Sequence, residues 1–142
     1  MKKLVLIVSM VLLFLSGCNT STSPSSTDSD AQNSQVASKV EYIKISAKEA
    51  KTIIDSEESV IILDVRTQEE FNEGHIEGAV LLPYDQIPQK ASTDLPDKGA
   101  KILVYCRSGN RSATASKSLI SLGYTNVTDF GGIIDWPYDI VK

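Results

Sequence analysis

Short apolar runs limit most strongly the folds that this chain can adopt. Each run ends abruptly and is followed by residues typical of the start of a helix. Residues 60–63 read Val-Ile-Ile-Leu and precede a capping box over residues 67–70. Residues 101–105 precede a helix predicted over 111–122, which Gly123 ends. Continuously apolar strands are typical of a sheet that is covered on both faces. The alternation predicts an α/β domain with a mainly parallel central sheet and helices on both faces.

The remaining segments extend the same alternation. A short strand is predicted over 42–45, and Ser46 with Glu49 forms a capping box that opens a helix. Further strands are predicted over 79–82 and 127–130. In such a fold the binding crevice lies beyond the carboxyl ends of the strands.

Two groups of polar residues follow predicted strand ends. Asp64 and Arg66 follow the strand over 60–63, and Cys106 follows the strand over 101–105. Because parallel strands end at the same edge, both groups are expected to face one opening.

The N-terminus has the pattern of a secretory signal. Residues 1–17 combine a basic start with an apolar run and a small-residue cleavage context before Cys18. The sequence Leu-Ser-Gly-Cys resembles the lipobox of bacterial lipoproteins. That resemblance implies a lipid on Cys18 and a tether to the extracytoplasmic face of a membrane in the bacterial cell envelope. The alternative is an ordinary cleaved signal.

The rest of the chain divides into a polar segment and one domain. Residues 18–39 are rich in Ser, Thr, Asn and Gln, so they cannot bury enough apolar surface to order and are expected to form a flexible stalk. Residues 40–142 have the usual size of one domain. The net charge of −4 argues against a nucleic-acid partner. His75 and Cys106 alone cannot assemble the usual zinc site.

Cys106 is the candidate nucleophile. If Cys18 is lipidated, Cys106 is a lone thiol in an oxidising compartment, which favours a reactive role. It is followed by a short polar loop and then a helix. The loop N–H groups and the helix N-terminus would stabilise a thiolate in a solvated, electropositive setting. The alternative is a buried cysteine that only fills the core. The residues expected to bind an anionic substrate are Arg107, Ser108, Gly109, Asn110 and Arg111.

For three residues the sequence leaves two possible roles. Arg107 either attracts an anionic substrate or is an ordinary surface cation. Arg111 opens a helix, where a cation is unfavourable unless an anion or a carboxylate partner lies nearby. Asp64 either pairs with Arg66 or braces the catalytic loop, and bracing is preferred to acid chemistry.

Four ordered motifs resemble a single-domain rhodanese, across about residues 42–137. They are Leu-Asp-Val-Arg at 63–66 with Glu-Phe at 70–71, Gly-His-Ile-Glu-Gly-Ala at 74–79, Tyr-Cys-Arg-Ser-Gly-Asn-Arg-Ser at 105–112, and Gly-Tyr at 123–124 with Gly-Gly-Ile at 131–133 before Trp136. In that family the motif around His75 is a structural turn.

The resemblance implies a sulfurtransferase of the thiosulfate type. Cys106 would take a sulfane sulfur from a donor such as thiosulfate and hold it as a persulfide. It would then pass the sulfur to a thiophilic acceptor such as cyanide or a thiol. Arg66 would help Arg107 and Arg111 to attract the anionic donor. No metal or organic cofactor is implied.

Two other functions remain as alternatives. A cysteine-dependent phosphatase or arsenate reductase also places a cysteine loop at a helix N-terminus, but its relatives use Cys-x5-Arg, whereas Cys106 and Arg111 are separated by four residues. The other alternative is a tethered persulfide carrier, or a binding module, that delivers sulfur only to another envelope protein and has no small-molecule turnover.

Overall fold

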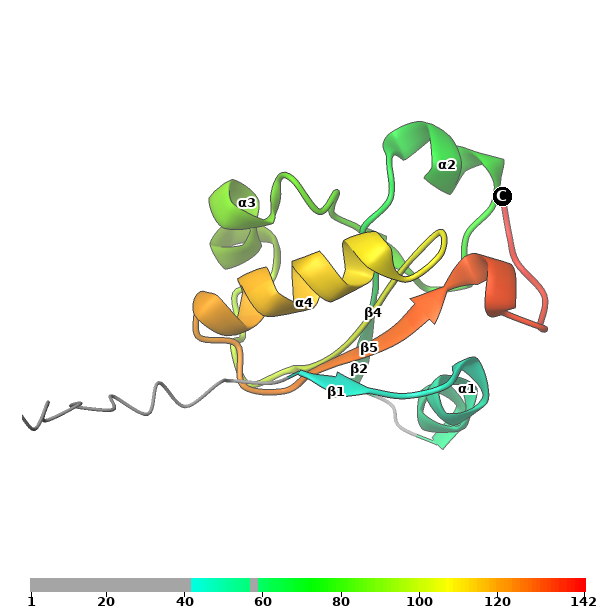
Figure 1. Cartoon of the computed structure of the whole chain (residues 1–142), viewed down its shortest axis with the longest axis horizontal. Coiled ribbons are helices and arrows are strands. Elements are labelled where there is room, and N and C mark those ends of the chain that lie inside the picture. Colours follow the sequence, from blue (N-terminus) through cyan, green and yellow to red (C-terminus); the bar gives the residue numbers. More distant parts are fainter. Residues whose placement is uncertain (1–41, 57–58) are drawn as a thin grey trace, which may run out of the picture. The chain divides into compact units, whose positions relative to one another are not determined.

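The structure is a computed structural model that describes residues 42–56 and 59–142 (Figure 1). The predicted signal over 1–17, the lipid attachment at Cys18 and the stalk up to residue 39 lie outside these residues. No helix within the described ranges has the length and apolar character needed to cross a membrane.

All five strands join one parallel sheet in the order β1-β5-β4-β2-β3. The strands are β1 (Ile43–Lys44), β2 (Val60–Asp64), β3 (Val80–Leu81), β4 (Lys101–Cys106) and β5 (Val127–Gly132). The central strand β4 pairs with β2 and β5 and is buried along almost its whole length. This burial on both faces is why β4 reads as a continuous apolar run.

Helices cover both faces of the sheet, as the sequence predicts (Figure 1). They are α1 (Ala47–Ser56), α2 (Gln68–Glu73), α3 (Ile87–Asp94) and α4 (Asn110–Ser121), and a 3-10 turn η1 (Ile133–Asp135) follows β5. One core cluster joins α3 and α4 to the sheet through Ala91, Ala115 and Leu119. The second cluster joins α1 to the opposite face through Ala50. The predicted fold class is therefore confirmed.

Both predicted capping boxes are present. The Thr67 hydroxyl accepts a hydrogen bond from the N–H of Glu70, and the Glu70 carboxylate accepts one from the N–H of Thr67. Ser46 and Glu49 make the same reciprocal pair at the start of α1. Helix α3, which lies between β3 and β4, was not predicted from the sequence.

A β-bulge interrupts the pairing of β4 with β5 where both strands end. Val104 pairs with Asp129, but Cys106 pairs with Gly132, so β5 spans one residue more than β4 over this interval. Gly131 lies in the bulge with a φ of 91°. The bulge brings the end of β5 against the loop that follows Cys106.

Candidate active site

Cys106 ends β4 at the carboxyl edge of the sheet, as predicted. The next residues turn back over the strand end, and the N–H of Gly109 donates a hydrogen bond to Cys106 Sγ at 3.1 Å. Helix α4 begins directly after this turn. The sulfur atom therefore lies beside a backbone donor and the start of a helix, two features that favour a thiolate.

The side chain of Cys106 is buried, which corrects the expectation of a solvated thiol. Only 1% of the residue is exposed, and it belongs to the core cluster beneath α4. The reason is that Cys106 still belongs to the central strand, whereas the exposed residues begin with Arg107 and Ser108. The thiol is not enclosed by hydrocarbon alone, because the Gly109 N–H points at it.

The turn depends on the backbone conformation of Gly109. Its φ of 96° is one that L side chains rarely adopt, and Gly109 directly precedes α4. The buried Ser112 hydroxyl donates to Gly109 O at 3.0 Å and approaches Gly131 O at 3.3 Å. Asn110 is the first residue of α4. The loop is thus tied both to its own helix and to β5.

Arg111 has a carboxylate partner, which is one of the two alternatives left open by the sequence. Its guanidinium donates two hydrogen bonds of 2.7 Å to Glu70, at the end of the first turn of α2. Hydrogen bonding to Arg111 lowers the pKa of Glu70 to about 2, against the opposing effect of burial. The same bonds raise the pKa of Arg111, against the opposing effect of burial.

The pair predicts an acid dependence of stability. A carboxyl with a lowered pKa stabilises the folded state above its ordinary pKa of 4.5, and this contribution is lost as the pH falls towards 2. E70Q should lower the free energy of unfolding by about 1 kcal/mol near pH 7, because the pair is partly exposed. Near pH 2 the variant and the wild type should unfold at the same temperature. Equal differences at both pH values would contradict this assignment.

Asp64 and Arg66 form the pair that the sequence left as an alternative to bracing. The Arg66 guanidinium donates to both carboxylate oxygens of Asp64, at 2.6 to 3.0 Å, and also to Gly74 O. Burial would lower the pKa of Arg66, but the hydrogen bonds and charge of Asp64 outweigh it and raise the pKa. Burial, followed by Asp64, raises the pKa of Tyr105. Within the described ranges no hydrogen bond joins Arg66 to the loop over 106–109.

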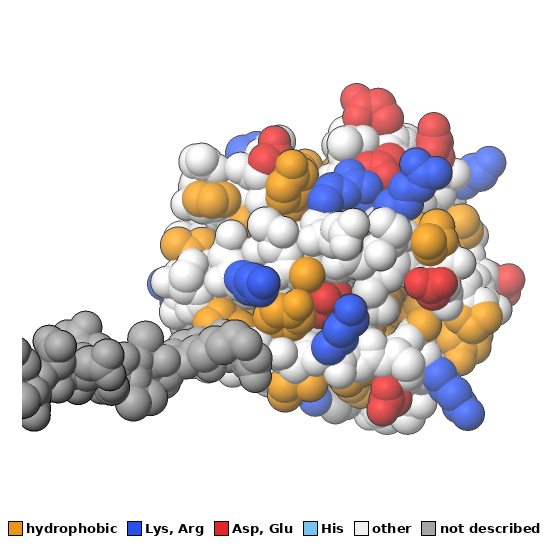
Figure 2. All heavy atoms as spheres, in the orientation of Figure 1, with side chains coloured by type: hydrophobic (Ala, Val, Ile, Leu, Met, Phe, Trp, Pro, Cys, Tyr) orange, Lys and Arg blue, Asp and Glu red, His pale blue; other side chains and the backbone are white. Residues whose placement is uncertain are grey.

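The surface above the loop is positively charged. Figure 2 shows Lys and Arg side chains gathered between α2 and the start of α4, with acidic side chains of α2 above them. Arg107 is exposed and Arg111 is partly exposed. This local charge is suited to attract a small anion although the chain as a whole is acidic.

Glu70 and Gly132 have roles at the site that were not predicted from the sequence. Glu70 was recognised as part of a capping box and of a family motif, but nothing local signals its contact with Arg111. A Cβ added to Gly132 would lie 2.3 Å from Arg107 O, so glycine is required there by close approach of the loop. The Gly-Gly pair at 131–132 was the available signal.

The described residues contain no group of three or more His, Cys, Asp or Glu side chains that could hold a metal ion.

His75 has a structural environment, as expected. Its ring stacks on Phe71 with centroids 3.7 Å apart, and its Nδ1 lies 3.0 Å from Phe71 O.

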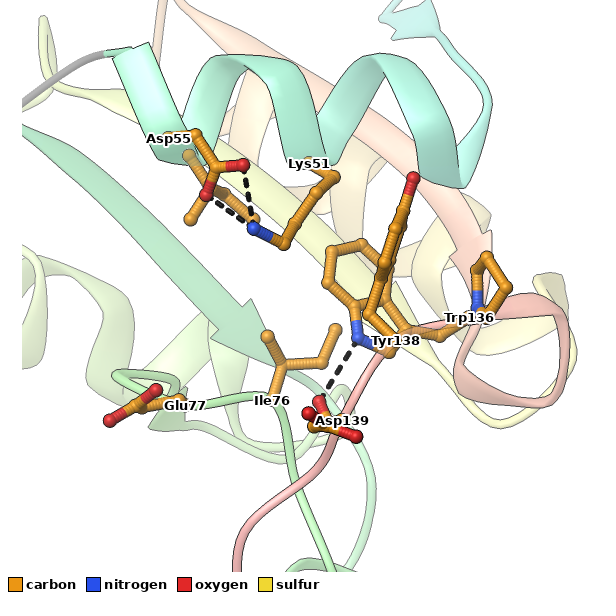
Figure 3. Close-up of a pocket in the computed structure, with 9 residues that line it drawn as sticks. Lys51, Asp55, Ile76, Glu77, Trp136, Tyr138 and Asp139 are labelled. Carbon is orange, nitrogen blue, oxygen red and sulfur yellow. Dashed lines mark hydrogen bonds and ion pairs between the residues drawn. The ribbon is translucent and has the colours of Figure 1, made fainter.

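A separate pocket of about 470 Å³ lies beside α1 (Figure 3). Lys51 pairs with Asp55 on one side of it, and Trp136 Nε1 donates to Asp139 O on the other. None of the predicted site residues lines this pocket. It is therefore distinct from the surroundings of Cys106.

The chain matches known proteins over its described part. The profile of the Rhodanese-like domain covers residues 46–137. Thiosulfate sulfurtransferase PspE of Escherichia coli is 36% identical over 80 residues, which are 56% of this chain and 77% of that protein. Putative sulfur carrier protein YrkF of Bacillus subtilis is 33% identical over 105 residues, which are 73% of this chain and 55% of that protein.

A solved structure described as a rhodanese with anions from E. coli is 33% identical. It superposes with a TM-score of 0.56 over 59% of this chain and 99% of that one. Several relatives of this chain are named sulfurtransferases. The chain belongs to the Rhodanese-like domain family.

Proposed function

We propose that this protein is a thiosulfate sulfurtransferase that works through a persulfide on Cys106. The observation that carries the proposal is the 3.1 Å hydrogen bond from the Gly109 N–H to Cys106 Sγ, at the start of α4. A donor in this position stabilises a thiolate and, after reaction, the outer sulfur of a persulfide. Arg107 is exposed and would attract the anionic donor to the loop, whereas the charge of Arg111 is offset by Glu70.

The reaction consists of two displacements at sulfur. The Cys106 thiolate attacks the sulfane sulfur of thiosulfate, a new S–S bond forms, and the S–S bond of thiosulfate breaks as sulfite leaves with the electron pair. Cyanide or a thiolate then attacks the outer sulfur, and the electron pair of the persulfide bond returns to Cys106. Neither step requires a general base once the thiol is ionised, which suits a site where His75 has a structural role.

Intact-mass spectrometry tests the first displacement. After incubation with thiosulfate, the protein should gain the mass of one sulfur atom on Cys106, and cyanide should remove it and form thiocyanate. No added mass would contradict the proposal. Phosphate-ester hydrolysis without thiocyanate would select the phosphatase alternative.

A persulfide carrier is the second candidate, and the similarity to a protein named putative sulfur carrier favours it. A carrier would gain one sulfur atom as above but would release it slowly to cyanide and small thiols. Turnover with small acceptors therefore separates the two functions.

The location of the protein is part of the proposal and is supported by the sequence alone. A lipid on Cys18 would tether the domain to the extracytoplasmic face of a bacterial membrane, where another envelope protein could accept the sulfur. Recovery of the full-length chain in the soluble fraction of cells would contradict this location.

A further inference from the structure

A buried carboxyl side chain, Asp129, lies on β5 at the start of the bulge, close in the sheet to Cys106. Asp129 is fully buried, and its backbone pairs with Val104, two residues before Cys106. Val127 belongs to the core cluster on the α4 face, and side chains alternate along a strand, so Asp129 faces α4 as well. It therefore lies on the same side of the sheet as Cys106.

One oxygen of Asp129 has a defined task. The N–H of Gly131 donates a hydrogen bond to Asp129 Oδ1 at 2.9 Å. A bulge leaves its extra residue outside the regular ladder, so its N–H needs another acceptor. The carboxylate supplies that acceptor and holds Gly131 in its conformation of positive φ.

The bulge is in contact with the catalytic loop. Gly132, which follows Gly131, lies so close to the loop that an added Cβ would be 2.6 Å from Ser108 Cα. The Ser112 hydroxyl lies within 3.3 Å of both Gly109 O and Gly131 O. A continuous set of contacts therefore leads from Asp129 through the bulge to the residue that donates to Cys106.

The second oxygen of Asp129 is unpaired within the part of the chain that the structure describes, so burial of this side chain lowers the stability of the folded state. Asp129 Oδ2 has no hydrogen-bond partner among the described residues, and neither has the buried hydroxyl of Ser116. Burial of an unpaired polar group is unfavourable, so an apolar residue would suit the core better. The presence of Asp129 at this buried position is therefore explained by its hydrogen bond to the bulge and not by packing in the core.

Ser116 is also fully buried, and its hydroxyl makes no hydrogen bond to the bulge or to any other described residue. Ser116 lies one turn, or about 6 Å, further along α4 than Ser112, whose hydroxyl donates to Gly131 O. The chain thus offers a matched control for removal of a buried polar group.

We propose that Asp129 is a positioning residue for sulfur transfer, whose carboxylate fixes the bulge that seats the catalytic loop and keeps the Gly109 N–H on Cys106. The role rests on the proposed function for its chemistry, but its effect on Cys106 can be measured without any sulfur donor. It acts through the backbone of Gly131 and Gly132 and does not touch the reacting atoms.

The test compares D129A, D129N and S116A with the wild type. D129A removes the acceptor for Gly131 and should slow the loading of sulfur from thiosulfate about tenfold, as expected when a hydrogen bond is lost and a donor is left without its partner. D129N keeps an acceptor at Oδ1 and should remain within about threefold of the wild type. S116A should load sulfur at the wild-type rate.

Alkylation of Cys106 by iodoacetamide gives a second measurement, which a purely structural role of Asp129 in packing would leave unchanged. The ratio of the alkylation rate near pH 6 to that near pH 9 reports how well the site stabilises the thiolate. The ratio in D129A should fall below that in D129N, which removes the same acidic group but keeps the acceptor, and the ratio in S116A should equal that of the wild type. Wild-type values in D129A, equal losses in D129A and S116A, or no rescue by D129N would each overturn the inference.

Two further results keep the test decisive. If D129A does not fold, hydrogen exchange at the Gly131 amide is measured instead. The inference requires that this amide is protected from exchange in both the wild type and D129N. Fast exchange in the folded wild type would overturn it. If the wild type takes up no sulfur, the proposed function fails, and the alkylation ratios still decide the role of Asp129.

Discussion

The C106S variant should lose sulfur transfer by at least about a thousandfold, the scale on which removal of a nucleophile acts. A serine alcohol stays protonated beside the Gly109 N–H and cannot form the S–S bond of a persulfide. The fold should survive, because the smaller hydroxyl occupies the place of a buried thiol at the end of β4. Thiocyanate formation from thiosulfate and cyanide measures the loss, and thermal unfolding checks the fold.

The second cysteine provides the matched control. The chain has two cysteines, and C18S makes the same chemical change outside the described domain. This variant should keep the wild-type rate of thiocyanate formation. Substantial turnover by folded C106S, or a loss of turnover in C18S, would show that the sulfur is carried elsewhere.

The architecture was predictable where the signals are local. A central strand such as β4 must be apolar throughout, and a capping box requires only residues that are three apart, so both are visible in a single segment of sequence. The parallel order follows from strands that alternate with helices. The cysteine loop was recognised for the same reason, because strand end, turn and helix start are contiguous.

Helix α3 was missed because its local signals conflict. Pro88 lies in its first turn and its eight residues include Ser, Thr and Asp, which together resemble a loop. The spacing of Ile87, Ala91 and Leu95 was the signal that could have found it. These three side chains are buried in the cluster beneath α4, and that tertiary packing stabilises the short helix.

The site differs from its prediction where contacts cross long stretches of sequence. Glu70 and Arg111 are 41 residues apart, so only the fold shows which carboxylate the arginine meets. The burial of Cys106 depends on the helix that covers β4. Arg66 was expected near the donor, but its guanidinium is occupied by Asp64 and Gly74.

The G132A variant should lose about a hundredfold in kcat/KM for thiosulfate, because misplacement by about 1 Å can have that effect on catalysis. The φ and ψ of Gly132 are −121° and 147°, which any residue adopts, so backbone strain is not the cause. The cause is contact, since the new Cβ would lie 2.3 Å from Arg107 O and 2.6 Å from Ser108 Cα. Both atoms are backbone, so the loop itself must move away from β5.

A matched substitution separates loop displacement from the general effect of adding a methyl group. The Cβ of G99A would meet only the flexible side chain of Asp97, at 3.3 Å, so this variant should keep both its activity and its stability. G132A should in addition lower the free energy of unfolding by about 1 to 3 kcal/mol, the usual cost of overpacking. Full activity in G132A would show that the loop can shift without losing the hydrogen bond to Cys106, and the role given to the close contact between β5 and the loop would then be wrong.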